Sequence, residues 1–172
     1  MKILFVQTGG TIDKDYPRTT KGYAFEIGEA AAKRIVDQVH HSIEPHFTTA
    51  FQKDSLEITD ADRQLLSDLV QDSECDKIVV THGTDTMIET ACFLCKHNSH
   101  KVVIFTGSHR PQKFTDSDAG FNLGAAVGAL SCINQPGIYI AMSGRVLPCH
   151  QVNRDSSGRF QEIDSTQQPL SN

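Results

Sequence analysis

Short apolar runs alternate along this chain with segments of helical periodicity, and this alternation constrains the fold more than any other feature. Such runs, rich in valine, isoleucine and phenylalanine, are typical of strands that are buried on both faces of a sheet. They occupy residues 3–6, 77–81, 102–105 and 138–142, and residues 46–51 are a further candidate strand. The alternation predicts an α/β fold of three layers, a mostly parallel Rossmann-like or flavodoxin-like sheet with helices on both faces.

The predicted helices occupy residues 28–41, a segment that begins after Thr59, residues 84–97 and residues 118–132. In the first helix, apolar residues recur every four positions, and the predicted core face consists of Ile27, Ala31, Ile35 and Val39. In the second, Thr59 is the predicted N-cap, and the predicted inner side consists of Ala61, Leu65, Leu66, Leu69 and Val70. Residues 145–160 are interpreted as a hairpin or a loop. We therefore expect one domain over residues 1–163, followed by a polar tail over residues 164–172.

Charge and composition exclude several classes of function. The 172 residues carry 16 Lys and Arg against 21 Asp and Glu, a net charge of −5, and the basic residues form no stripe of the kind that binds nucleic acid. No apolar run is long enough to cross a membrane, and the first one is too short for a secretory signal. These features predict a soluble, cytoplasmic protein. The odd number of cysteines, five, predicts reduced thiols.

Two strand ends carry the segments with the most chemical character. Thr8-Gly9-Gly10-Thr11-Ile12 follows the first run, and Thr81-His82-Gly83-Thr84-Asp85-Thr86 follows the run at 77–81. Ligands of parallel α/β sheets bind beyond the carboxyl ends of the strands, and glycines let the backbone approach a ligand closely. Each segment alone also fits an ordinary tight turn before a helix cap. Residues 11–25 lack periodicity and are interpreted as a long loop of the kind that covers a site.

Five collinear segments together resemble the bacterial-type L-asparaginase and glutaminase family, specifically its catalytic N-terminal domain in a short-chain form. They are residues 8–12 (TGGTI), Asp54-Ser55, residues 82–86 (HGTDT), residues 107–111 (GSHRP) and residues 118–123. The resemblance runs from about residue 3 to about residue 160. It implies a cofactor-free, metal-free amidohydrolase that converts L-asparagine to L-aspartate and ammonia through a threonine nucleophile and an acyl-enzyme intermediate. A glutaminase side activity is also implied.

The resemblance assigns roles to six residues. Thr11 matches the attacking threonine, and Tyr23 matches the tyrosine that contacts its hydroxyl. Thr84 matches the second catalytic threonine. Ser55 matches the serine that holds the substrate's α-carboxylate, and Asp85 matches the carboxylate that meets the α-ammonium group. The backbone N–H groups of Gly10 and Thr84 are expected to form the oxyanion hole, where fixed donors stabilise a tetrahedral intermediate.

Two departures from the family pattern affect these expectations. The family's catalytic lysine is missing, since the last lysine is Lys113, and Arg154 is the candidate replacement. A guanidinium does not release its proton near neutral pH, so Arg154 is expected to orient Asp85 but not to serve as a base. Family members are also longer, two-domain chains in which a neighbouring subunit helps to close the pocket. We expect looser amino-acid selectivity and a homo-oligomer, a dimer or tetramer. Gly124-x-x-x-Gly128 fits either subunit contact or packing on the sheet within one chain.

Other interpretations of the chain remain open at this point. Cys92-x-x-Cys95-x-His97-x-x-His100 resembles a set of zinc ligands, but its spacing fits no common module, and the helical spacing favours two buried core thiols. His82 is expected to be structural. The chain could also be a non-catalytic amino-acid-binding or regulatory module that lost turnover with the lysine, or an amidase for another small amide.

Overall fold

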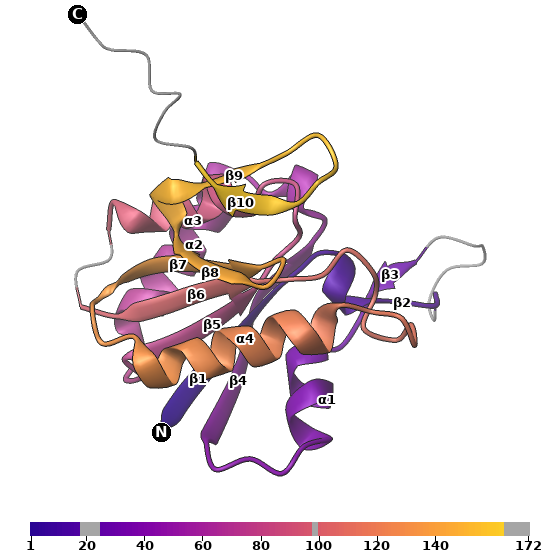
Figure 1. Ribbon diagram of the computed structural model, residues 1–172, viewed down its shortest axis with the longest axis horizontal. Helices are drawn as coiled ribbons and strands as arrows, with labels where there is room; N and C mark the ends of the chain where they lie inside the picture. The colour runs from indigo at the N-terminus through magenta and orange to yellow at the C-terminus, as the bar shows by residue number, and fades with distance from the viewer. Residues whose placement is uncertain (18–24, 98–99, 164–172) are drawn as a thin grey trace, which may run out of the picture.

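The computed structural model describes residues 1–17, 25–97 and 100–163, and a six-stranded sheet forms its centre (Figure 1). The strand order is β4-β1-β5-β6-β7-β8, and all neighbouring pairs are parallel except β7 and β8. The strands are β1 (Lys2–Gly9), β4 (Glu44–Lys53), β5 (Lys77–Thr81), β6 (Val102–Thr106), β7 (Gly137–Met142) and β8 (Arg145–Pro148). The predicted mostly parallel α/β sheet in a single domain is confirmed.

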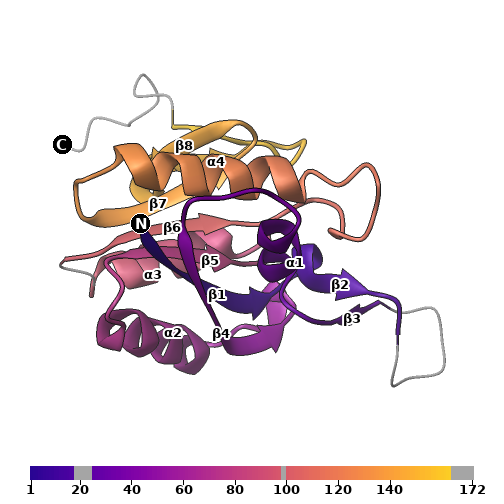
Figure 2. The same cartoon turned by 90° about the horizontal axis from the view of Figure 1, so that it is seen from below.

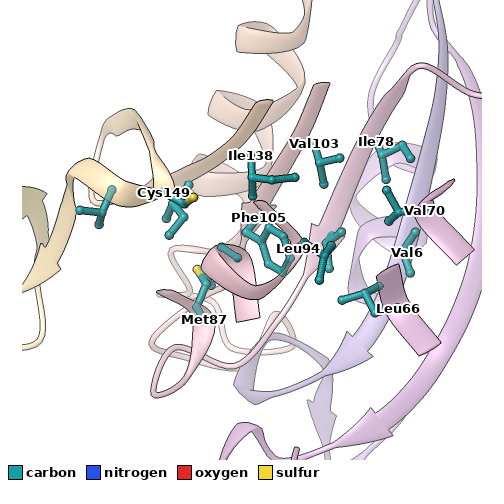
Figure 3. Packing of buried hydrophobic residues seen from close by; sticks show 14 of the residues in the cluster. Val6, Leu66, Val70, Ile78, Met87, Leu94, Val103, Phe105, Ile138 and Cys149 are labelled. Atoms are coloured by element: carbon teal, nitrogen blue, oxygen red, sulfur yellow. The ribbon is translucent and has the colours of Figure 1, made fainter. Parts of the chain in front are cut away.

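Helices cover both faces of this sheet, and Figure 2 shows α4 and α2 on opposite sides of the strands. The helices are α1 (Ala31–Asp37), α2 (Asp60–Asp72), α3 (Met87–Cys95) and α4 (Ala119–Cys132). Successive strand residues point to opposite faces, so Ile104 packs with α1 and α4 while the next residue, Phe105, packs with α2 and α3 (Figure 3). This alternation explains why the central strands are apolar at nearly every position.

The second predicted helix forms with the expected start. Thr59 accepts a hydrogen bond from the Asp62 N–H, and the Asp62 carboxylate accepts from the Thr59 N–H, which completes a capping box for α2. The predicted inner side is wrong in part, because Ala61 and Leu65 are exposed while Arg63 is buried. The buried Arg63 guanidinium is compensated by carboxylates, since Nη1 lies 2.9 Å from Asp60 Oδ1 and Nη2 lies 3.0 Å from Glu89 Oε1.

The first predicted helix is shorter than expected. It spans Ala31–Asp37 rather than residues 28–41, and Val39, predicted to face the core, is 56% exposed. The helix begins later than predicted because the residues before it pair with another segment. After a 3₁₀ turn, η1 (Thr11–Asp13), the short strand β2 (Lys14–Asp15) pairs antiparallel with β3 (Glu26–Ile27), which projects from the sheet in Figure 1. The predicted loop over residues 11–25 is thus partly ordered as a ribbon. Residues 18–24 lie outside the described residues, and the interpretation of the loop as a cover of the site stays a prediction.

The glycines of α4 lie on the face of that helix away from the sheet. A Cβ added at Gly120, Gly124 or Gly128 would meet no atom within 4 Å, whereas Leu123 and Leu130 of the same helix are buried against the strands. Packing on the sheet within one chain therefore does not explain the Gly124-x-x-x-Gly128 motif. The outward side of α4 is uncharged along its whole length.

The chain beyond β7 forms short antiparallel elements. Strand β8 pairs with β7, and a 3₁₀ turn, η3 (Cys149–Gln151), leads into a hairpin of β9 (Val152–Arg154) and β10 (Phe160–Glu162). The hairpin predicted as one of two alternatives for residues 145–160 is confirmed in part, since it covers residues 152–162 and residues 145–148 pair with β7 instead. The tail expected over residues 164–172 lies outside the described residues, and the division at residue 163 stays a prediction.

Candidate active site

The strand order places a topological switch point between β1 and β5, and we call the region beyond the carboxyl ends of these two strands the crevice. The connection after β1 runs outward to β4, whereas the connection after β5 runs to β6 on the other side. Loops that leave neighbouring strands in opposite directions leave an opening between them, where ligands of α/β folds bind. Both glycine-containing segments predicted from the sequence follow these two strands.

The two turns touch through their glycines. Gly10 has a φ of +83°, and a Cβ at this position would lie 2.3 Å from Gly83 N. A Cβ on Gly83 would lie 2.7 Å from Ser55 Oγ. Only glycine permits this approach, since a Cβ at Gly10 would collide with backbone atoms of the other turn and a Cβ at Gly83 would collide with the Ser55 side chain. Three segments distant in sequence thus meet here, and Thr11 and Thr84 each directly follow one of the touching glycines.

Hydrogen bonds of the Ser55 carbonyl and of the neighbouring Asp54 carboxylate fix Ser55 in this crevice. It opens the 3₁₀ turn η2 (Ser55–Glu57), is only 3% exposed, and its carbonyl accepts a 2.7 Å hydrogen bond from Thr86 Oγ1. The preceding Asp54 accepts a hydrogen bond from the Leu56 N–H and pairs with Lys14 Nζ at 3.0 Å. The hydrogen bond from Lys14 lowers the pKa of Asp54 below its ordinary value. Asp54 and Ser55 together therefore join the ribbon after β1 to the turn after β5.

Arg154 reaches the turn after β5 from the C-terminal hairpin. Its Nη1 donates to Asp85 Oδ1 at 2.9 Å and to the carbonyl of Thr84 at 3.1 Å. Its guanidinium also lies 5.6 Å from the centre of the Phe160 ring, a cation–π contact that holds the side chain in place. Arg154 is the cation predicted as the replacement for the family lysine, and the structure places it on Asp85.

The structure gives the backbone N–H of Gly10, which was expected in the oxyanion hole, a different partner. Its backbone N–H donates to the carbonyl of Lys53 at 3.0 Å, as an extension of the pairing between β1 and β4. An N–H that is committed to a neighbouring strand cannot also point at an oxyanion in the crevice. Gly10 shapes the site through its close contact with Gly83. Of the two backbone N–H groups expected to form the oxyanion hole, that of Thr84 remains as the donor.

A third wall of the crevice comes from the loop after β6. The Asp118 carboxylate accepts from the backbone N–H groups of His109 at 3.0 Å and Arg110 at 3.3 Å. Asn122 Nδ2 donates to Asp118 Oδ2 at 2.9 Å and to the carbonyl of Gly107 at 3.0 Å. Residues 107–111 and 118–123, quoted from the sequence as separate segments, are therefore one hydrogen-bonded unit.

His82 is buried and neutral. Its side chain is fully excluded from solvent, and Nδ1 lies 2.8 Å from the carbonyl of Gly83, so Nδ1 carries the proton. Burial lowers the pKa of His82 from its ordinary value of 6.5 to about 4, although the hydrogen bond to Gly83 raises it. The ring stands edge-on to Phe105. The expected structural role of His82 agrees with this geometry, since its ring holds the glycine turn through the hydrogen bond from Nδ1 to the carbonyl of Gly83.

Asp13 is a site-adjacent residue that sequence reasoning missed. It follows Thr11 by two positions and is fully buried, and its Oδ1 accepts a 2.7 Å hydrogen bond from the N–H of Ala31 at the start of α1. Among the described residues Oδ2 has no hydrogen-bond partner. Burial raises the pKa of Asp13 from its ordinary value of 3.8 to about 6, although the Ala31 hydrogen bond lowers it. No sequence signal separates this aspartate from Asp15, its neighbour in the same polar stretch.

Asp13 and His82 oppose each other in the pH dependence of stability. The folded-state pKa of Asp13 is raised, so the protonated carboxyl adds to the free energy of unfolding. This contribution is complete below pH 3.8 and is lost as the pH rises through 6. The folded-state pKa of His82 is lowered, so its contribution is complete above pH 6.5 and is lost as the pH falls through 4. Each contribution is worth about 3 kcal/mol, so the two largely cancel between pH 4 and 6.5.

The Asp13→Asn variant should expose this cancellation. Without the Asp13 carboxyl, acidification from about pH 7 to pH 4 is expected to lower the free energy of unfolding by about 3 kcal/mol more than in the wild type. Urea unfolding at several pH values in this window measures the difference. Parallel curves for the two proteins would show that the Asp13 carboxyl titrates normally.

Of the remaining predicted site features, Tyr23 lies in the segment 18–24, outside the described residues. The set of Cys92, Cys95, His97 and His100 is not gathered as a metal site, since no group of three or more metal-ligating side chains converges within residues 1–17, 25–97 and 100–163. The expectation of two buried thiols on α3 is wrong in part, because Cys92 is half-buried while Cys95 is exposed. Burial raises the pKa of the nearby Cys149 thiol. All five cysteines are free.

The fold and the crevice define a doubly wound α/β domain in which two glycine–threonine turns meet at the carboxyl edge of the sheet. A family described as "Asparaginase, N-terminal" matches residues 2–171, so the chain belongs to the asparaginase family and corresponds to its N-terminal domain. None of the helices in the described part of the chain is both long enough and apolar enough to span a membrane.

Relatives and solved structures agree with this assignment. A glutaminase-asparaginase from Acinetobacter glutaminasificans is 32% identical over 88% of this chain and 49% of its own length. The thermostable L-asparaginase from Thermococcus kodakarensis superimposes with a TM-score of 0.83 at 27% identity, over 95% of this chain and 51% of that one. A Campylobacter jejuni protein named "Probable Cytoplasmic L-asparaginase" gives 0.75 at 28% identity, over 95% and 53%. The chain spans about half the length of the curated relatives that it matches.

Proposed function

We propose that this chain carries the catalytic half of an amidohydrolase that converts L-asparagine to L-aspartate and ammonia, with L-glutamine as a secondary substrate. The observation that supports the proposal is the contact of Gly10 with Gly83 and of Gly83 with Ser55, because Thr11, Thr84 and Asp85 directly follow these glycines in the chain. The relatives named as asparaginases and glutaminase-asparaginases support the same substrate class.

In this proposal Thr11 attacks the side-chain amide carbon and forms an acyl-enzyme, which water then hydrolyses. Ser55 holds the α-carboxylate, Asp85 holds the α-ammonium group, and the N–H of Thr84 donates to the oxyanion. A carboxylate fixed opposite the ammonium group orients the amide carbon toward the attacking oxygen. A preorganised donor stabilises the tetrahedral intermediate without any reorganisation during the reaction.

Arg154 limits the proton transfers of this reaction. The threonine must lose a proton and the departing ammonia must gain one, but a guanidinium bound to Asp85 keeps its protons at neutral pH. Its role in the proposed reaction is electrostatic, since it holds Asp85 and the carbonyl of Thr84 in place. The expected consequence is slow turnover with an intact substrate pocket.

Arg154→Lys is therefore expected to raise kcat by about tenfold or more, because an ammonium group can exchange its proton near neutral pH. Arg154→Ala removes the charge that holds Asp85 and is expected to raise KM for asparagine. Steady-state ammonia release from the wild type and both variants measures these effects. A lysine variant slower than the wild type would show that the guanidinium itself is required.

A panel of amides tests the proposed function directly. L-Asparagine, L-glutamine and succinamic acid, which is asparagine without its α-amino group, are each incubated with the protein while ammonia is measured. The proposal expects asparagine to react faster than glutamine and succinamic acid. Faster reaction of succinamic acid would identify an amidase for another small amide. Ammonia from none of the three would contradict the enzymatic proposal.

The Arg154–Asp85 contact also favours a second candidate, a non-catalytic amino-acid-binding module. In that case the crevice binds aspartate or asparagine but lacks a group for proton transfer. Calorimetry with aspartate, combined with the ammonia measurement at high protein concentration, separates binding without turnover from catalysis.

The assembly and the location of the enzyme are further parts of the proposal. We infer a homo-oligomer from the resemblance to the family. The cytoplasmic location stays a prediction, because one similar protein is named cytoplasmic and a relative from Haemophilus influenzae is named a periplasmic L-asparaginase. Size-exclusion chromatography with light scattering would give the oligomeric state.

A further inference from the structure

Asp13 connects the turn that carries Thr11 to the start of α1. Its N–H donates to the carbonyl of Gly10 at 3.2 Å, and its carbonyl accepts from the N–H of Gly28 at 2.9 Å. Its carboxylate accepts from the N–H of Ala31 at 2.7 Å. The residue thus uses its backbone and its side chain to join three segments around η1, and Thr11 is the first residue of that turn.

The surroundings of Asp13 keep its carboxyl away from water. Ile12, Ala31 and Ala119 form a small buried cluster around η1, and the carbonyl of Ile12 accepts a 3.2 Å hydrogen bond from the Gln112 N–H. A carboxyl oxygen in such a place gains much from each donor, because water cannot compensate for a lost hydrogen bond. The 2.7 Å bond from Ala31 therefore has a large influence on where the carboxyl and its turn lie.

The charged group that acts on Asp13 is Arg34 of α1, and Gln7 of β1 faces it as a neutral donor. Arg34 Nε donates to Gln112 Oε1 and Nη1 donates to the carbonyl of Glu29, both at 2.8 Å. Its Nη2 is buried and, among the described residues, has no hydrogen-bond partner, as is also true of Asp13 Oδ2. The described residues thus leave one carboxyl oxygen of Asp13 and one guanidinium nitrogen of Arg34 buried without a hydrogen bond.

The other charged residues near η1 have partners elsewhere. Lys14 pairs with Asp54, and Lys113 lies 3.5 Å from Asp15 on the ribbon. Arg34 is the charged group identified as acting on Asp13, so the charge of the Asp13 carboxyl changes its attraction to α1 directly.

We propose that Asp13 is a positioning residue for Thr11, and that its ionised carboxylate holds η1 against the start of α1 in the geometry that lets Thr11 reach the substrate. This inference rests on the proposed function. Ionised acceptors form shorter and stronger hydrogen bonds than neutral ones, so protonation loosens the link to Ala31 and weakens the attraction to Arg34. A displacement of the nucleophile by about 1 Å lowers the rate by about a hundredfold.

The experiment compares kcat and KM for asparagine between about pH 5 and pH 8 in the wild type, Asp13→Asn and Asp15→Asn. The asparagine side chain of the first variant keeps an oxygen that accepts from Ala31 but cannot ionise. We expect wild-type kcat to rise as the pH increases through about 6. In Asp13→Asn that rise should be absent, and kcat at about pH 8 should be about 10-fold to 100-fold lower with KM nearly unchanged. Asp15→Asn, which removes the same charge from the adjacent ribbon, should behave as the wild type.

Each other outcome contradicts a defined part of the proposal. If Asp13→Asn retains both the wild-type kcat and the rise through about pH 6, Asp13 does not position Thr11. If kcat falls but the rise persists, the ionisation of Asp13 is not what matters. If Asp13→Asn does not fold, the wild-type profile decides, since a flat kcat across about pH 6 overturns the proposal. No ammonia from the wild type overturns the proposed function, and the role of Asp13 with it.

Discussion

Replacing Thr11 with alanine is expected to lower kcat for ammonia release from asparagine by about a thousandfold or more. The hydroxyl of Thr11 is the proposed nucleophile, and loss of a nucleophile leaves only the contributions of binding and of the oxyanion donor. Thr11 is half-buried at the start of η1, where the fold depends on the backbone and on Asp13. The alanine variant should therefore fold normally and bind aspartate with nearly unchanged affinity.

Two further variants make the Thr11 experiment specific. Thr11→Ser keeps a hydroxyl at the same place and should retain measurable turnover, whereas Thr11→Val keeps the shape and should be as inactive as the alanine variant. Ammonia release is followed for all three, and acyl-enzyme formation is followed by mass spectrometry. If Thr11→Ala retains activity within a few-fold of the wild type, Thr11 is not the nucleophile.

Gly10→Ala is expected to damage both the site and the fold. The added Cβ would lie 2.3 Å from Gly83 N, and the residue would have to keep a φ of +83° that L side chains rarely adopt. Either the two turns separate or the backbone is strained. We expect kcat/KM to fall by about a hundredfold or more and the free energy of unfolding to fall by about 2–4 kcal/mol.

Gly128→Ala is the matched control for this substitution. It adds the same methyl group to a glycine, but in α4, where no atom lies within 4 Å. Alanine favours a helix over glycine by about 0.5–1 kcal/mol, so this variant should be slightly more stable and fully active. Urea unfolding and ammonia release compare the two variants. If both are tolerated equally, the turns after β1 and β5 do not approach as closely as the structure shows.

The sheet was predictable because its strands are buried on both faces. The segments 77–81 and 102–105 match β5 and β6 within one residue, since apolar residues at nearly every position leave no alternative pattern. Helix boundaries were less predictable. The periodicity at Ile27 and Val39 favoured a longer first helix, but Ile27 pairs with Lys14 in the ribbon, and tertiary pairing of this kind leaves no local signal.

The candidate site was predictable only where a residue type is indispensable. Gly10 and Gly83 are required by a backbone contact that any side chain would block, so they stand out in the sequence. The commitment of the Gly10 N–H to Lys53 was not predictable, because it depends on where β4 ends. The burial of Asp13 depends in the same way on the packing of α1 and β1 around it, which a single polar residue in a polar stretch does not indicate.

The exposed glycines of α4 affect the stability of one wall of the crevice. Three of the fourteen residues are glycines on the solvent side, and each costs about 1 kcal/mol of helix stability relative to alanine. The helix is therefore stable only through its packing on the sheet, and local unfolding of α4 is cheaper than global unfolding. Its first turn carries Asn122, and Asp118 directly before it holds the loop at residues 107–111. Any loss of α4 packing would therefore also release the hydrogen bonds of Asp118 and Asn122 that hold the wall of the crevice after β6.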